Sequence, residues 1–599
     1  MAVAFAAVLT LFAGPAAART LTGTPCGRTP GLLCSDIAVP LDRSGAFPGT
    51  LTLHVEVLPP TGVSRGAIFL IAGGPGQGSA HSFDLGTPSS ASLFQYLFPG
   101  YTLVAYDDRG TGNSGLINCP ALQVTTDLDQ ARQLAADCAS TIGPQRAFYG
   151  TADHAEDLEA VRQLVGVDKI ALYGVSYGTK LALAYALAHP DHVERLVLDS
   201  VLPPDQPDPY QANVLRDLPG TVNAFCADSC AVTHDFAGDV VAVANALAAK
   251  PLHGTVLRPD GRTKAEKLDG AGVVGMVIDA DLNPGLAAEL PAAMHAARGG
   301  NVKPLLRLYD LDNQASLLSA ADLSFGLYAA TSCRDGTFPW TPDTPIASRQ
   351  ALLTQAIAAL PAGTFGRFGS WAAKLGNADF CLDWPSPSGG EPLGAGPLPN
   401  VPVLAISGGF DIRTPTENAT EVLSRFPQGR LLTVPGIGHS ALLADPSGCA
   451  LNAVRAWILG GTPPPTCPRK PSLLDPLAAF PAAKATGKDG PGTTYAIAAK
   501  TVREAEAAWY LATNGGSSGT VAGIYAGHIT TTGSRTFKLV GYSIAPGVSV
   551  SGSLRLTTYG PPLAFQGLLT VGGRSAAQGS LGLVDDTLRG TLGGKRVGG

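Results

Sequence analysis

The chain has 599 residues, of which 45% are hydrophobic and 15% charged, so it can bury a large core and is too long for one ordinary domain. Its 41 basic and 47 acidic residues leave a net charge of −6, and it lacks the dense basic stripe that binding to a phosphate backbone requires. We therefore expect two domains, one of them large, and exclude nucleic acid from the expected partners.

The first 18 residues are predicted to be a secretory signal peptide. Their apolar stretch is too short to span a bilayer, and it ends in the small-residue cleavage site Ala16, Ala17 and Ala18. Because no Lys or Arg precedes the apolar stretch, a start further upstream or an uncleaved anchor stays an alternative. No later segment is apolar enough for a transmembrane helix, so we expect a secreted or extracytoplasmic protein, at the cell surface or in the periplasm.

The segment 19–204 is predicted to form the first part of an α/β core. From about Thr50 to Ser200, apolar runs alternate with helical patterns, and such alternation is typical of a parallel sheet with crossover helices. The strands are expected at 51–58, 67–74, 101–108, 169–174 and 195–200. An amphipathic helix is expected at 153–166, and another follows Ser176.

The alternation stops at Leu202 and resumes at Val401, so 400–467 is predicted to be the second part of the same core. Its strands are expected at 401–409 and 430–436. The long insert 205–399 between the two parts is predicted to be mostly short helices, among them 212–225, 239–250, 285–300 and 348–360. An insert at this position indicates a lid over the carboxyl ends of the strands.

After Cys467 the composition changes. A linker at 468–493 precedes a helix at 494–512, and short alternating segments follow from about Thr520. Alternation with Gly and Asp turns predicts a small antiparallel sandwich or barrel, so 494–599 is expected to be a helix plus a β-rich accessory domain, with possible docking to the cell surface. Its tyrosines are expected to pack in the ordinary way, the alternative being an exposed platform for a surface polymer: Tyr525, Tyr542 and Tyr559.

Ten cysteines, an even number in a chain that looks exported, predict a disulfide framework, because oxidising compartments preserve such bonds. The sequence leaves their connectivity open, and neighbours along the chain suggest Cys26 with Cys34, Cys119 with Cys138, Cys226 with Cys230, Cys333 with Cys381, and Cys449 with Cys467. The cysteines show no metal-ligand spacing, and we expect neither a metal nor an organic cofactor.

A serine stands between a predicted strand and a predicted helix in the segment 174–178, Gly-Val-Ser-Tyr-Gly. Glycine on both sides permits the tight turn that lifts the Ser176 hydroxyl off the sheet toward a helix N-terminus, as in the nucleophile elbow of an α/β-hydrolase. The motif alone is a weak signal in a chain with 73 glycines. Its partners must therefore be found elsewhere in the chain.

A serine nucleophile needs a histidine as base and a carboxylate that orients the histidine. Asp411 and His439 each follow a predicted strand, in the chain order Ser, acid, His that this fold uses. We predict that Ser176, Asp411 and His439 form a catalytic triad, with Asp199, at another strand end, as the rival acid. The other histidines suit structural or solvent-facing positions, for example His54, His189 and His192.

The oxyanion of the reaction must be held by backbone N–H groups. The loop Gly73-Gly74-Pro75-Gly76 follows a predicted strand and can bring the N–H of about Gly74 to face that of Tyr177, the residue after the nucleophile. We therefore predict an oxyanion hole made by Gly74 and Tyr177.

Five separated motifs resemble those of the prolyl iminopeptidase and tripeptidyl aminopeptidase group of secreted α/β-hydrolases: GGPG at 73–76, DDRGTGNSG at 107–115, GVSYG at 174–178, FDIRTP at 410–415 and GIGHS at 436–440. The resemblance covers about Thr22 to Cys467 and leaves out the β-rich tail. Ala72 stands where prolyl iminopeptidases commonly have a histidine before GGPG, and this favours the tripeptidyl type.

The resemblance implies a serine aminopeptidase that cleaves after one to three residues of peptides with a free N-terminus, while its lid limits substrate length. Such an enzyme needs carboxylates that bind the protonated α-amine. Asp335 is the leading candidate, followed by Asp205 and Asp208, although a turn or surface role is the more common one for each such carboxylate. The alternatives are an esterase or amidase acting on small secreted metabolites and a non-catalytic surface-binding protein.

Overall fold

The computed structural model describes eight stretches of the chain: 23–205, 208–227, 229–385, 397–481, 490–513, 519–533, 535–584 and 586–598. The predicted signal peptide and part of the predicted linker lie outside the described residues. Among the helices that are described, none combines the length and apolar character that crossing a membrane requires.

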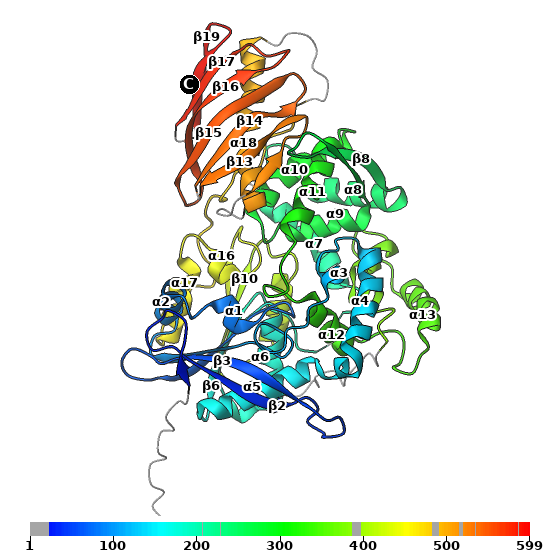
Figure 1. Ribbon diagram of the computed structural model, residues 1–599, viewed down its shortest axis with the longest axis vertical. Coiled ribbons are helices and arrows are strands. Elements are labelled where there is room, and N and C mark those ends of the chain that lie inside the picture. The colour runs from blue at the N-terminus through cyan, green and yellow to red at the C-terminus, as the bar shows by residue number, and fades with distance from the viewer. Residues whose placement is uncertain are drawn as a thin grey trace, which may run out of the picture.

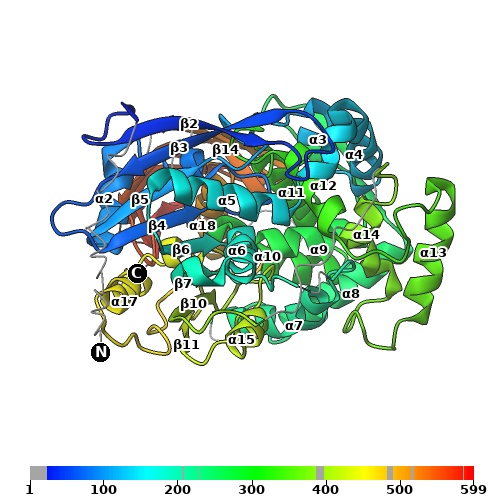
Figure 2. The same ribbon diagram turned by 90° about the horizontal axis from the view of Figure 1, so that it is seen from below.

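A nine-stranded sheet forms the first domain, with strand order β1-β2-β3-β5-β4-β6-β7-β10-β11 (Figure 2). The six strands from β5 to β11 run parallel, and β1 to β3 form an antiparallel edge. Their bounds are β1 Thr24–Pro25, β2 Leu33–Pro40, β3 Thr50–Leu58, β4 Gly66–Ile71, β5 Tyr101–Tyr106, β6 Ile170–Val175, β7 Val193–Asp199, β10 Val403–Gly408 and β11 Gly429–Val434. The predicted α/β-hydrolase fold is thus confirmed.

Helices cover both faces of this sheet, because the central parallel strands are apolar on both sides. One face packs against α5 (Thr151–Val165), α6 (Tyr177–Ala188) and α15 (Thr416–Leu423). The other face packs against four helices: α1 Ser79–Phe83, α2 Pro88–Leu97, α16 Ala441–Ala444 and α17 Cys449–Ile458. A short 3₁₀ turn, η2 (Pro190–His192), leads from α6 into β7.

Two insertions lie beyond the carboxyl ends of the strands. The smaller one, between β5 and α5, contains α3 (Pro120–Gln123), α4 (Leu128–Ile142) and η1 (Gly143–Phe148). The larger one is the predicted lid, with α7 Ala212–Cys226, α8 Phe236–Ala249, β8 Leu252–Leu257, β9 Thr263–Leu268, α9 Gly270–Asp279, α10 Pro284–Arg298, α11 Lys303–Ala315, α12 Phe325–Asp335, α13 Ile346–Ala359, η3 Ser370–Leu375 and α14 Asn377–Phe380. The lid is mainly helical, as expected, and also carries the hairpin β8–β9.

The C-terminal part is one eight-stranded antiparallel sheet whose strands pair in chain order, curled around helix α18 (Pro491–Thr513) (Figure 1). A helix therefore covers the inner face, where the sequence led us to expect a second sheet or a closed barrel. Trp509 of α18 stacks on Phe537 and meets Phe565 edge to face. The strands are β12 Thr520–Ala522, β13 Ala526–Gly533, β14 Thr536–Ala545, β15 Val548–Thr558, β16 Ala564–Gly572, β17 Gly579–Val584, β18 Thr587–Leu592 and β19 Lys595–Val597.

The three tyrosines of the tail do not share one exposed platform. Tyr542 is fully buried, Tyr525 lies under the ammonium of Lys303, and Tyr559 is 55% exposed. This arrangement is the ordinary packing that we expected.

Five disulfides join the ten cysteines in the pairs that their neighbourhood in the sequence suggested: Cys26–Cys34, Cys119–Cys138, Cys226–Cys230, Cys333–Cys381 and Cys449–Cys467. Such a set fits an oxidising compartment outside the cytoplasm.

Candidate active site

Ser176 lies at a sharp turn between β6 and α6. Its backbone has φ 56° and ψ −123°, a conformation that non-glycine residues rarely adopt. The flanking glycines explain why the turn forms, since a Cβ on Gly178 would collide with the carbonyl oxygen of Ile71 and one on Gly174 with that of Gly178. The serine is therefore raised above the end of the sheet, at the N-terminus of α6.

His439 and Asp411 meet in the loops that follow β11 and β10. The Nδ1 atom of His439 lies 3.1 Å from both carboxylate oxygens of Asp411. Thr414 supports the acid, because its N–H and hydroxyl donate to Asp411 over 2.9 Å and 2.6 Å. Burial alone would raise the pKa of Asp411, but the charge of His439 and hydrogen bonds from His439, Thr414 and Ser200 hold this pKa below its usual value.

The Nδ1 contact leaves Nε2 of His439 as the nitrogen that can serve Ser176. Within the described residues, the Ser176 hydroxyl and His439 are not hydrogen-bonded to each other. Such bonds often tighten only when substrate binds, so the arrangement still suits a nucleophile and its base.

Asp199, the rival acid, has a different environment. Its carboxylate accepts from the N–H of Leu442 at 3.1 Å, and its carbonyl accepts from the N–H of Ser176 at 2.9 Å. Burial raises the pKa of Asp199 to about 7, so it is a poorer permanent anion than Asp411. Asp199 therefore stabilises the turn that carries Ser176. Its raised pKa favours Asp411 over Asp199 as the partner of His439.

The loop Gly73–Gly76 lies beside the nucleophile, where the oxyanion hole is predicted. A Cβ on Gly73 would come within 3.0 Å of Cβ of Ser176, and Gly74 has φ 110°. The lid braces this loop, since the N–H of Ser324 donates to the carbonyl of Gly76 at 2.8 Å. Gly74 and Tyr177 therefore lie on the two segments that flank Ser176.

The lid residue Asp281 contacts the loops of the histidine and the acid. Its carboxylate accepts from the N–H groups of Ile412 and Arg413 at 2.9 Å and 3.0 Å, and its carbonyl accepts from the N–H of His439 at 2.9 Å. The guanidinium of Arg413 lies 2.8 Å from the same carboxylate. No local motif marks Asp281, so the sequence did not predict its contact with these loops.

Asp281, Asp411 and His439 have polar atoms within 4.8 Å of one another, a spacing that metal ligands also show. Both carboxylates, however, already accept hydrogen bonds from Arg413 or Thr414. Their contacts favour a charge network that orients His439 over a metal site.

The three carboxylates predicted to bind the substrate amine each have partners inside the protein. Asp335 pairs with Lys180 at 3.0 Å and accepts from the N–H and hydroxyl of Thr151. Asp205 binds the guanidinium of Arg425 with both oxygens, at 2.8 Å and 2.9 Å. Asp208 accepts two backbone N–H groups at the start of α7, from Tyr210 and Asn213.

Asp312 on α11 is a lid carboxylate of another kind. Its side chain is nearly buried, with 5% exposure, and in the described part of the chain neither a hydrogen bond nor an ion pair engages it. Burial and the neighbouring Asp279 raise the pKa of Asp312 well above its usual value, against the charge of Arg413. Arg413 thus acts on this carboxyl group only through its charge, with neither a hydrogen bond nor an ion pair between the two side chains.

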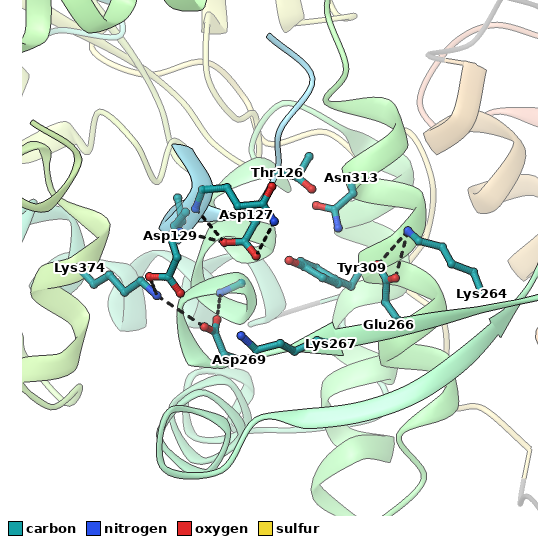
Figure 3. A pocket seen from close by; sticks show the side chains of 13 residues that line it. Thr126, Asp127, Asp129, Lys264, Glu266, Lys267, Asp269, Tyr309, Asn313 and Lys374 are labelled. Carbon is teal, nitrogen blue, oxygen red and sulfur yellow. Dashed lines mark hydrogen bonds and ion pairs between the residues drawn. The ribbon is translucent and has the colours of Figure 1, made fainter. Parts of the chain in front are cut away.

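A cavity of about 340 Å³ opens between the lid and the N-terminal end of α4 (Figure 3). Its acidic and basic side chains largely neutralise one another, since Lys374 lies 2.8 Å from Asp129 and Lys264 lies 3.0 Å from Glu266. The described residues that line it include neither Ser176 nor His439. The cavity is thus separate from the candidate active site.

Comparisons with known proteins match this arrangement. A family model described as the alpha/beta hydrolase fold matches residues 66–235, which contain Ser176, and one described as TAP-like protein matches residues 367–467, which contain Asp411 and His439. Serine protease Hip1 of Mycobacterium tuberculosis is 27% identical over 478 residues, which cover 73% of this chain and 86% of that protein.

Tripeptidyl aminopeptidase of Streptomyces coelicolor is 27% identical over 473 residues, which cover 72% of this chain and 81% of that enzyme. Proline iminopeptidase of Neisseria gonorrhoeae is 29% identical over 135 residues, which cover 22% of this chain and 32% of that enzyme. With its hydrolase sheet, its TAP-like segment and these relatives, the chain is an enzyme with an α/β-hydrolase fold that is similar to tripeptidyl aminopeptidases.

Proposed function

We propose that the protein is a secreted serine exopeptidase that removes short N-terminal pieces from peptides with a free amine. The observation that carries the proposal is the buried contact between His439 and Asp411 at the strand ends that also present Ser176. The names of the relatives support a peptidase, and the five disulfides support secretion.

In this mechanism the Ser176 hydroxyl attacks the scissile carbonyl while Nε2 of His439 takes its proton. Asp411 holds the Nδ1–H of His439 and stabilises the imidazolium that forms. The N–H groups of Tyr177 and Gly74 bind the oxyanion of the tetrahedral intermediate. His439 then gives its proton to the departing amine, and water, activated by the same histidine, releases the N-terminal piece from the acyl-enzyme.

The proposal needs a group that recognises the ammonium of the substrate. As carboxylates, Asp335, Asp205 and Asp208 could each bind an ammonium. Each would first have to break a hydrogen bond or ion pair that it already makes within the protein. Asp312 meets the requirement better, because its side chain is nearly buried and, within the described residues, has no hydrogen-bond or ion-pair partner that an entering ammonium would have to displace. We therefore propose Asp312, with Asp279 beside it, as the amine-binding carboxylate.

Replacing Asp312 with asparagine is expected to raise KM for free-amine tripeptide substrates by about ten- to one-hundredfold and to change kcat little, because the lost contact lies away from the reacting bond. Steady-state kinetics with tripeptidyl p-nitroanilides measure this. Asp260→Asn, which alters an exposed lid carboxylate that binds Arg262 in the turn of the β8–β9 hairpin, is the matched control and should leave KM near the wild-type value. An unchanged KM in Asp312→Asn would remove the residue from the site.

The peptidase activity itself is tested with tripeptidyl p-nitroanilides that carry a free or an acetylated N-terminus. A strict requirement for the free amine is the expected result. Equal turnover of both forms, together with faster cleavage of simple esters, would favour the esterase or amidase alternative.

A further inference from the structure

The C-terminal domain, residues 490–598, packs directly on the lid and lies outside both matched family models. Lid helix α10 lies against α18, with the C-terminal sheet beyond it (Figure 1). One continuous apolar core contains residues of α10, α11, α18 and the C-terminal strands. The tail is therefore built into the lid, which argues against a separate docking module on a flexible tether.

We propose that the C-terminal domain positions the catalytic histidine, acting through α18, α10 and the lid residue Asp281. This inference rests on the proposed role of Ser176, Asp411 and His439. Asp281 and the domain that holds it would be positioning elements, since neither takes part in bond making.

The first contact between the C-terminal domain and the histidine loop joins α18 to α10. A Cβ on Gly285, in the first turn of α10, would lie 2.5 Å from the carbonyl oxygen of Ala507 and 2.6 Å from the nitrogen of Leu511. The two helices thus meet backbone to backbone at this glycine. The side-chain amide of Asn283 donates to the carbonyl of Leu511 at 3.2 Å, and its oxygen caps α10 by accepting from the N–H of Gly285 at 2.9 Å.

A buried charge network fixes the same interface. Arg307 of α11 lies 2.9 Å from Glu289 of α10 and 2.7 Å from Glu504 of α18, and it donates to the hydroxyl of Tyr542 on β14 at 2.5 Å. All three charged side chains are at most 4% exposed. Because an unpaired charge is very unfavourable at such depth, this network opposes separation of the lid from the C-terminal domain.

The second contact joins α10 to the triad. Asn283 is only two residues from Asp281, and hydrogen bonds from the N–H groups of Asp281 and Leu282 to the end of α9 make the connection a tight turn. The carbonyl of Asp281 accepts from the N–H of His439, and its carboxylate holds the loop that carries Asp411. A displacement of α10 would therefore move the residue that touches both catalytic loops.

Asp281 can affect His439 both through its position and through its charge. The charged groups around the His439 ring are Asp411, Asp281 and Asp199, with Arg413 behind Asp281. Removing the charge of Asp281 should make the imidazolium less stable, so the acid limb of the reactivity profile should move to lower pH.

The test uses the full-length protein and a fluorophosphonate that labels Ser176, so it does not depend on the identity of the peptide substrate. The maximal labelling rate and the half-saturating probe concentration are measured in assays at several pH values between 5 and 9. The thermal unfolding midpoint of each variant is measured as a check of folding. Four variants are compared: Asp281→Asn, Asn283→Ser, Gly285→Ala and the control Tyr495→Phe. Serine keeps the cap of α10 but is too short to reach Leu511, and Tyr495 lies on α18 and donates to Leu588 within the C-terminal domain.

We expect Asp281→Asn to slow maximal labelling by about tenfold and to shift the acid limb down by about half a pH unit or more, with little change in half-saturation. Asn283→Ser and Gly285→Ala should slow labelling by about threefold while the sheet and α18 stay folded, and Tyr495→Phe should match the wild type. Wild-type rates and profiles in folded Asn283→Ser and Gly285→Ala would overturn the inference. A wild-type protein that the probe does not label at Ser176 would instead contradict the proposed function.

Discussion

Ser176→Ala is expected to lower kcat/KM for free-amine peptides by about 10⁴-fold or more, because the acyl-enzyme cannot form without the hydroxyl. The substitution removes one oxygen from a turn whose shape is set by Gly174 and Gly178, so the fold should be retained. Steady-state assays with tripeptidyl p-nitroanilides, together with fluorophosphonate labelling, measure the effect.

Ser89→Ala, which changes an exposed serine on α2, is the matched control for this variant and should keep full activity. A folded Ser176→Ala protein that retained more than about one hundredth of the wild-type kcat/KM would show that another group is the nucleophile.

Asp411→Asn is expected to lower kcat by about 10³- to 10⁴-fold at neutral pH, because an amide cannot stabilise the imidazolium and favours the wrong tautomer of His439. Asp199→Asn should cost at most about tenfold, since the pKa of Asp199 is raised to about 7 and its carboxylate faces the N–H of Leu442. Parallel kinetics of the two variants, with circular dichroism as a check of folding, separate the candidate acids.

The reverse order of effects would contradict the assignment of the acid. If Asp411→Asn kept nearly full turnover while Asp199→Asn lost it, Asp199 would be the residue that orients His439.

Continuous apolar runs were enough to predict seven of the nine strands of the hydrolase sheet, because buried parallel strands have this pattern, whereas β1 and β2 at the antiparallel edge were not predicted. The run at 169–174, for example, became β6 at Ile170–Val175. The lid was harder to predict. Its hairpin β8–β9 carries polar and charged residues on strands that are only half buried, and no periodicity distinguishes these segments from loops. The curled C-terminal sheet shows the predicted alternation, but the pattern did not reveal that α18 would fill its inner face.

Some residues of the candidate site could also be predicted from the sequence, and others could not. The placement of Ser176, Asp411 and His439 at one edge of the sheet was predictable, because each follows a strand and the carboxyl ends of parallel strands meet at one edge. Thr414 lies three residues after Asp411, and this spacing in a turn is a local signal that could have identified it. Asp281 and Asp312 depend on how lid helices pack over the core, which leaves no mark in the local sequence.

The most direct test of the proposed exopeptidase is a profile of the purified enzyme against a peptide library, each member present with a free and with an acetylated N-terminus, and with Ser176→Ala as the blank. Mass spectrometry identifies the pieces released. We predict that pieces of one to three residues leave only from peptides with a free N-terminus and that the blank releases none. Cleavage of acetylated peptides at comparable rates, or cleavage far from the N-terminus, would contradict the account.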